Sequence, residues 1–118
     1  MTTIKGGFGN PTSREFEEIE VTIANAANNS GTIGLGRGAC GSFQLGSTFD
    51  GVEAKVQVSI DGSNWTDVAV EGNEVLLMVV AADGTYPLPE KTFFAPYARI
   101  VATTAQTGAT TIKVFLRG

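Results

Sequence analysis

Strict alternation of apolar and polar residues over VEAKVQVSID, residues 52–61, constrains this chain more than any other feature. A period of two places successive side chains on opposite faces of a β-strand, whereas a helix would scatter them around its circumference. The segment is therefore predicted to be a strand with one face in the core. That apolar face is expected to contain Val52, Ala54, Val56, Val58 and Ile60.

A tight turn is predicted directly after this strand, at Asp61-Gly62-Ser63-Asn64. Asp and Asn side chains bond nearby backbone amides, and Gly accepts a positive φ. The β-favouring residues from Trp65 to Val70 then predict a returning strand. Trp65 is the only tryptophan, and we expect it to fill the core beside the turn. The alternative is an exposed tryptophan that binds a ligand.

The rest of the chain also favours strands and turns. Fifteen glycines in 118 residues, together with many short apolar runs, are typical of an all-β fold. We predict an antiparallel β-sandwich or jelly roll of about eight strands, formed by one domain over residues 14–118. Further strands are expected at 16–24, at 42–45, at 75–80, and at 97–104 and 110–117, the last two as a C-terminal hairpin.

Two segments are candidates for contacts with a partner. Residues 1–13 contain three glycines and a proline and are expected to form an arm. It is either a frayed terminus or a segment that orders against a neighbouring subunit through Ile4 and Phe8. Residues 75–80 are continuously apolar, which is typical of a strand buried on both faces. Its outer face is expected either to contact a partner through Leu77 and Val79 or to lie under a long loop.

Catalytic and cofactor chemistry is poorly supported. The chain has no histidine and one cysteine, Cys40, which removes His-based nucleophile pairs, His-ligated metal sites and a thiolate zinc site. Residues 36–41 match GxGxxG by letter, but a strand is predicted after them instead of the helix that a dinucleotide site needs. Glu18 and Glu20 are the alternative acid–base or calcium pair, although an acidic outer strand face is ordinary. We expect no enzyme, no cofactor and no metal.

Charge argues against two classes of partner. The formal net charge is −4 with eight Lys plus Arg, so neither nucleic acid nor a membrane surface is an expected partner. The first ten residues contain no apolar signal region, and the chain is expected to be made in a reducing cytoplasm. Arg99 lies mid-strand, where it is expected to pair with a carboxylate or extend toward solvent.

The run VQVSIDGSNWTDV, residues 56–68, resembles a pattern found in small β-sandwich proteins of tailed-bacteriophage particles. The likeness continues through FFAPYARI at 93–100 and the terminal Leu116-Arg117-Gly118, and so covers roughly residues 50–118. The SxDGxxW element within it also occurs in carbohydrate-binding and discoidin-like sandwiches.

The resemblance implies a virion structural protein at the capsid surface. It favours a capsid decoration (cement) protein that binds the major capsid protein and associates with itself, as a trimer or alternatively a dimer. One alternative is a carbohydrate-binding module with Trp65, Tyr86 and Tyr97 as an aromatic platform. Another is an adaptor of the particle neck or tail.

Overall fold

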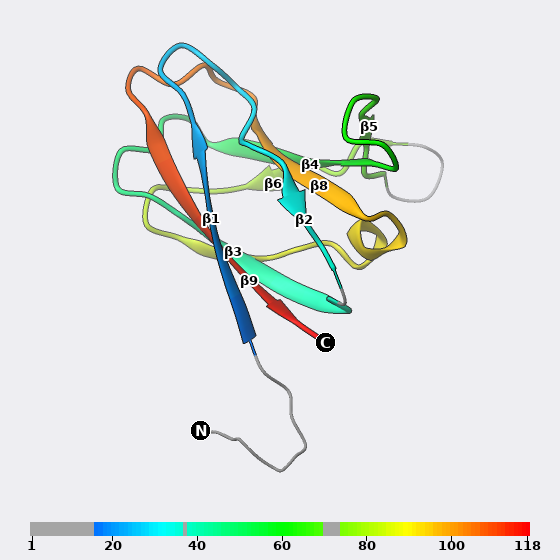
Figure 1. Cartoon of the computed structure of the whole chain (residues 1–118). Helices are drawn as coiled ribbons and strands as arrows, with labels where there is room; N and C mark the ends of the chain where they lie inside the picture. The colour runs from blue at the N-terminus through cyan, green and yellow to red at the C-terminus, as the bar shows by residue number, and fades with distance from the viewer. Residues whose placement is uncertain (1–15, 37, 70–73) are drawn as a thin grey trace.

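The computed structural model describes residues 16–36, 38–69 and 74–118, which form a β-sandwich with one short 3₁₀ helix (Figure 1). The elements in chain order are β1 (Phe16–Ile23), β2 (Ile33–Gly34), β3 (Cys40–Leu45), β4 (Glu53–Ser59), β5 (Thr66–Asp67), β6 (Met78–Val79), β7 (Thr85–Pro87), η2 (Glu90–Phe94), β8 (Tyr97–Ala102) and β9 (Thr110–Arg117).

The strands form two antiparallel sheets. The first sheet has the order β1–β9–β3–β7, and the second has the order β2–β8–β4–β5, with β6 pairing on β4 as well. This confirms the predicted all-β antiparallel sandwich, with nine strands in the described part of the chain instead of about eight. The predicted arm, residues 1–13, lies outside the described residues, as do its anchors Ile4 and Phe8.

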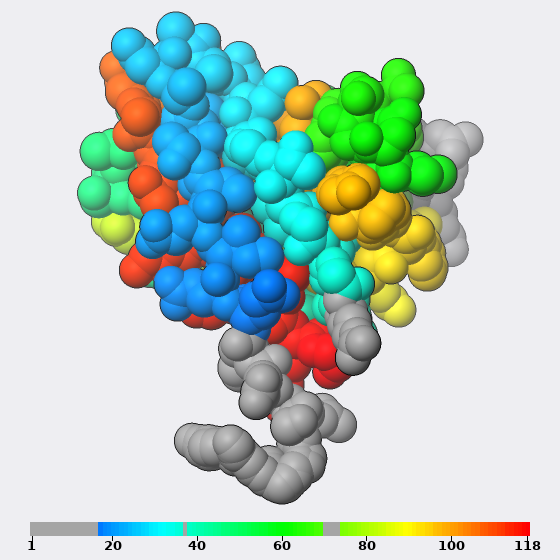
Figure 2. All heavy atoms as spheres, in the orientation of Figure 1, coloured from blue at the N-terminus to red at the C-terminus, as the bar shows by residue number. Residues whose placement is uncertain are grey.

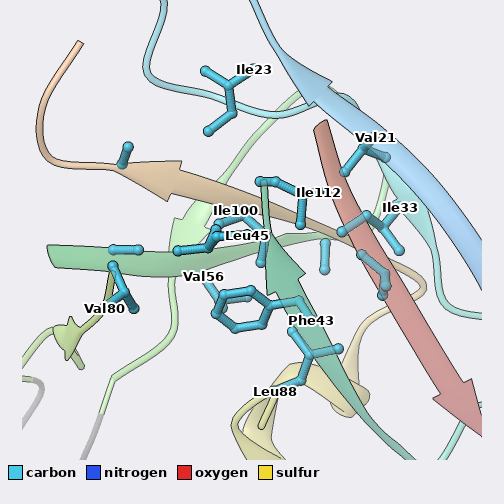
Figure 3. Packing of buried hydrophobic residues seen from close by; sticks show 14 of the residues in the cluster. Val21, Ile23, Ile33, Phe43, Leu45, Val56, Val80, Leu88, Ile100 and Ile112 are labelled. Atoms are coloured by element: carbon cyan, nitrogen blue, oxygen red, sulfur yellow. The ribbon is translucent and has the colours of Figure 1, made fainter. Parts of the chain in front are cut away.

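A single core lies between the sheets, and period-two alternation places the residues that fill it. In β9, Ile112, Val114 and Leu116 are buried whereas Lys113 between them is exposed. Phe43 of β3 lies near the centre, with Val56 and Ile100 of the second sheet among the core residues around it (Figure 3). Both sheets thus contribute to one hydrophobic cluster.

The predicted central hairpin is present. β4 pairs with β5, with Gln57 opposite Asp67. Its apolar face is shorter than expected, because only the middle of the alternating run lies in the strand. Val52 and Ile60 flank β4 and are 68% and 83% exposed, so their assignment to the core was wrong.

The predicted C-terminal hairpin is wrong. β8 pairs with β2 and β4 in the second sheet, whereas β9 pairs with β1 and β3 in the first. The connection between them therefore crosses from one sheet to the other. Gln106 in this connection is 1% exposed, and its side chain bonds the backbone of Asp50 at both N and O. Buried polar groups of a crossing loop need such partners.

Candidate functional site

Side chains of three neighbouring strands meet on the outer face of the second sheet. Gln57 of β4 is paired with Arg99 of β8 on one side and Asp67 of β5 on the other. Its Oε1 accepts a hydrogen bond from Arg99 Nε at 2.7 Å, and its Nε2 donates to Asp67 Oδ1 at 2.9 Å. Lys55 Nζ lies 3.0 Å from the same Asp67 oxygen. With Trp65, these residues are called the outer-face cluster below.

Trp65 covers the Arg99 end of this cluster. The Arg99 Cζ atom lies 4.4 Å from the centroid of the Trp65 ring, which is cation–π geometry. Trp65 immediately precedes Thr66, which pairs with Val58 of β4, and Val58 in turn pairs with β8. The ring therefore extends across β4 to reach Arg99.

The prediction that Trp65 fills the core was wrong. Trp65 is half-buried and is neither a buried core residue nor one of the side chains packed against the core. Its side chain lies on the outer face, where Arg99 supplies the contact that the core was expected to give. Whether this surface tryptophan binds a ligand stays a prediction.

Among the described residues, no carboxylate forms an ion pair with Arg99. Arg99 was expected to pair with a carboxylate or extend toward solvent, and in the structure its Nε donates to the amide oxygen of Gln57. Burial lowers the pKa of Arg99, but a guanidinium remains charged in proteins. The pKa of Asp67 is lowered, chiefly by the hydrogen bond from Gln57 and also by Lys55. Two charged groups are thus held on either side of a neutral amide.

The proposed aromatic platform is only partly assembled. Tyr97, two residues before Arg99 on β8, also lies on the second sheet and is partly exposed. Tyr86 belongs to β7 of the first sheet, where its ring packs 5.8 Å from that of Phe43. Its hydroxyl oxygen accepts a hydrogen bond from the backbone N–H of Ala81. Tyr86 therefore does not share a surface with Trp65 and Tyr97.

Residues 75–79 present apolar side chains at the edge of the second sheet. Val75, Leu77 and Val79, called the edge row below, are 40%, 47% and 80% exposed. Only Met78 and Val79 pair with β4, so the prediction of a strand buried on both faces was wrong. Val79 is largely open and Leu77 about half open to solvent, and their role in binding a partner stays a prediction.

A second apolar surface lies at the tip of the β4–β5 hairpin. Ile60 and Phe94, both more than 80% exposed, border a hollow of about 400 Å³ between this tip and η2. Val58 and Thr66 also line it. Figure 2 shows the hairpin tip (green) beside the segment around η2 (yellow to gold) on one side of the molecule.

The turn beside this hollow is held by Asp61. Its Oδ1 accepts hydrogen bonds from the backbone N–H groups of Ser63 and Asn64 at 2.8 and 2.9 Å, and from Ser59 Oγ at 3.0 Å. Asn64 Nδ2 donates to the other oxygen. These bonds, led by that of the Asn64 amide, lower the pKa of Asp61 far below its usual range. The predicted turn chemistry is confirmed, and Gly62 has a φ of +80°.

The other residues singled out from the sequence do not converge on a site. Glu18 and Glu20 project from the exposed side of edge strand β1, opposite Phe115 and Lys113 of β9. The GxGxxG run leads into strand β3 and not into a helix. Gly41 is there for close packing, because a Cβ would collide with the carbonyl oxygen of Phe115. Cys40 is exposed.

Sequence reasoning missed two features of these surfaces. Ile60 was assigned to the core by extending the alternation one step past the end of β4, so the hollow was not expected. The contact between Arg99 and Gln57 joins residues 42 positions apart and depends on the register of β4 against β8. For Trp65, residue type alone raised the alternative of an exposed side chain that binds a ligand.

Comparisons with protein-family models, with curated proteins and with solved structures find no match to this chain. The resemblance to phage particle proteins therefore stays a prediction. Within residues 16–36, 38–69 and 74–118, no three His, Cys, Asp or Glu side chains are grouped so as to hold a metal ion. The same residues include no helix long and apolar enough to cross a membrane.

Proposed function

We propose that this protein is a non-enzymatic structural component of a tailed-phage virion, acting as a capsid decoration (cement) protein. It would be made in the host cytoplasm, bind the major capsid protein on the outer shell, and associate with itself as a trimer, with a dimer as the alternative. Neither nucleic acid nor membrane is among the proposed partners, in keeping with the net charge of −4.

The edge row is the observation that carries this proposal. It places three aliphatic side chains in solvent beside β4, on a sheet edge that ordinarily needs protection from other chains. Complete burial of a Val or Leu side chain contributes about 1.5–3 kcal/mol. Contact between copies through the edge row would create an oligomer, and several weak attachments per oligomer add through effective concentration.

The proposal divides the work between two segments. The edge row joins copies to each other, and residues 1–13, with Ile4 and Phe8, attach the oligomer to the shell. The resemblance of residues 50–118 to phage sandwich proteins supports the same assignment. The resemblance applies equally to a neck or tail adaptor. A position at the neck or tail of the particle therefore remains the alternative.

A co-sedimentation assay with empty shells of the cognate phage tests the proposal. Deletion of residues 1–13 is expected to weaken binding at least tenfold while leaving the far-ultraviolet circular dichroism spectrum unchanged. The double variant Leu77→Ser and Val79→Ser is expected to weaken binding to a similar extent, because avidity is lost. The matched control, Ile60→Ser with Phe94→Ser, removes exposed apolar side chains away from the edge row and should bind normally.

Equal binding by the wild type, the truncated form and the edge-row variant would refute this division. Copy number on purified particles separates the two virion positions. A shell carries on the order of hundreds of copies, whereas a neck or tail ring carries about a dozen, as closed ring symmetry requires.

One observation favours a second candidate, a carbohydrate-binding module. Trp65 lies at the surface beside Arg99 and on the same sheet as Tyr97. Exposed aromatic side chains next to hydrogen-bond donors are a common way to hold a sugar.

A further inference from the structure

We propose that the outer-face cluster binds a carboxylated saccharide, with Arg99 holding the carboxylate and Trp65 packing against the sugar ring. This inference refines the carbohydrate-binding candidate and does not depend on attachment to a shell. It rests on Arg99, Gln57 and Trp65, whereas β6, the strand of the edge row, pairs with β4 at Glu53 and Ala54, so each proposal can fail without the other.

Arg99 has donors to spare. Its hydrogen bond within the described part of the chain runs from Nε to Gln57, and neither terminal nitrogen has a protein partner there. Arg99 is only partly buried, and both terminal nitrogens keep some contact with solvent. The two terminal N–H groups of a guanidinium match the two oxygens of a carboxylate as parallel hydrogen bonds.

The guanidinium is also held in place before any ligand arrives. Trp65 covers one of its faces at 4.4 Å, and Gln57 fixes Nε from the side. Ordering a long side chain on binding costs free energy, and this cost is largely met already in the folded protein. Arg99 is therefore preorganised as a fork.

Gln57 keeps the positive charge of Arg99 available. It stands between Arg99 and Asp67 in the strand register. The Asp67 carboxylate is itself compensated by Lys55 at 3.0 Å. A carboxylate in place of Gln57 would form an ion pair with Arg99 inside the protein. The neutral amide of Gln57 orients the guanidinium but leaves its positive charge available for an anionic ligand.

The character of the surroundings selects a saccharide among carboxylated ligands. The half-buried indole of Trp65 offers an apolar surface, and its Nε1 donor has no partner in the described residues and is not sealed from solvent. The apolar C–H face of a pyranose ring packs on such a surface while its hydroxyls accept hydrogen bonds. The cluster contributes one guanidinium and the chain has a net charge of −4, which suits a monoanionic carboxylate better than a dianionic phosphate.

The full-length protein can be titrated with trigalacturonate while the fluorescence of Trp65, the only tryptophan, is followed. A saturable change is expected for trigalacturonate and not for its methyl ester, which has the same rings without the charges. The Trp65 indole and Arg99 Nε–H resonances in ¹H–¹⁵N spectra should shift over the same concentration range.

Substitution separates the site from general charge effects. Arg99→Gln is expected to weaken binding at least tenfold. Arg99→Lys is expected to weaken it less, because lysine keeps the positive charge but cannot donate two parallel hydrogen bonds to the carboxylate. Lys113→Gln, which removes one positive charge from the exposed face of the first sheet, is the matched control and should bind like the wild type. Thermal unfolding of each variant establishes that it is folded.

Three results would overturn the inference. They are equal binding of the methyl ester, unchanged affinity in a folded Arg99→Gln variant, and a Trp65 response to an acidic peptide in the absence of any response to trigalacturonate.

Discussion

A single carboxylate, that of Asp61, holds the turn at the tip of the β4–β5 hairpin. It accepts two backbone and two side-chain hydrogen bonds from residues between Ser59 and Asn64. Because these bonds favour the ionised form, the pKa of Asp61 is lowered in the folded state. A carboxylate with a lowered folded-state pKa adds stability above its unfolded pKa of about 3.9, and this stability is lost as the pH falls further.

Replacement of Asp61 by asparagine is therefore expected to flatten the acid side of the stability profile. The wild type should lose stability progressively from about pH 4 downward, and Asp61→Asn should lose less over that range while being less stable at pH 7. Urea midpoints measured from pH 7 to pH 2 check this. Asp50 and Asp67 also have lowered pKa values, so the slope should diminish but not vanish.

Asp83→Asn is the matched control for this prediction. Asp83 is an exposed turn residue whose carboxylate makes no hydrogen bond within the described residues. The substitution should leave the acid slope unchanged. If Asp61→Asn and Asp83→Asn give superimposable profiles with the wild type, Asp61 does not couple its ionisation to folding.

At the scale of elements, the connection between β8 and β9 is the feature that makes this a sandwich. Its Gln106 accepts a hydrogen bond from Asp50 N at 2.8 Å and donates to Asp50 O and Thr104 O at 2.9 and 3.0 Å. The backbone of Gln106 also bonds Ala26 and Ala27. One buried residue thus ties three loops together at the end of the two sheets.

Gln106→Leu is expected to destabilise the protein by about 2–4 kcal/mol. The substitution keeps roughly the volume but leaves the part-buried N–H and carbonyl of Asp50 without their side-chain partner, and each unsatisfied buried group costs about 1–3 kcal/mol. Urea unfolding at pH 7 measures the difference. Gln44→Leu, on the outer face of β3, is the comparison and should change stability by less than about 0.5 kcal/mol. A similar small change for Gln106→Leu would contradict this role.

The elements also show where sequence reasoning succeeds. Alternation identified β1, β4 and β9 because each has one face in the core and one in solvent, and a two-residue period records that difference directly. It did not reveal that β8 and β9 pair in different sheets, since pairing is a property of the whole fold. Residues 75–80 were misinterpreted because an uninterrupted apolar run looks the same in the sequence whether the strand is buried within its own chain or lies exposed at a sheet edge.

The candidate site was less accessible to sequence reasoning than the fold. Trp65 and Tyr97 were named from their residue type, and the structure places both on the second sheet. Gln57 and Arg99 were not connected with them, because that contact requires the register of three strands. Residues that form a surface cluster across several strands are far apart in the sequence, so no local motif identifies them.

At the scale of the whole molecule, self-association through the edge row would link stability to protein concentration. Anything that binds the folded state and not the unfolded state raises the unfolding temperature by mass action. For a chain of 118 residues, folding coupled to dimer or trimer formation raises the midpoint by about 3–4 °C for each tenfold increase in concentration. The wild type is expected to show this dependence in calorimetry over the micromolar range.

The edge-row variant, Leu77→Ser with Val79→Ser, should abolish that dependence. Both side chains are exposed in the single chain, so their loss should leave the monomer fold intact while removing the apolar contact between copies. Its midpoint should be the same at every concentration, and light scattering should give the mass of one chain. If the unfolding temperature of this variant still depends on concentration, the copies associate through another surface. The hollow bordered by Ile60 and Phe94 is then the next surface to test, with Ile60→Ser and Phe94→Ser.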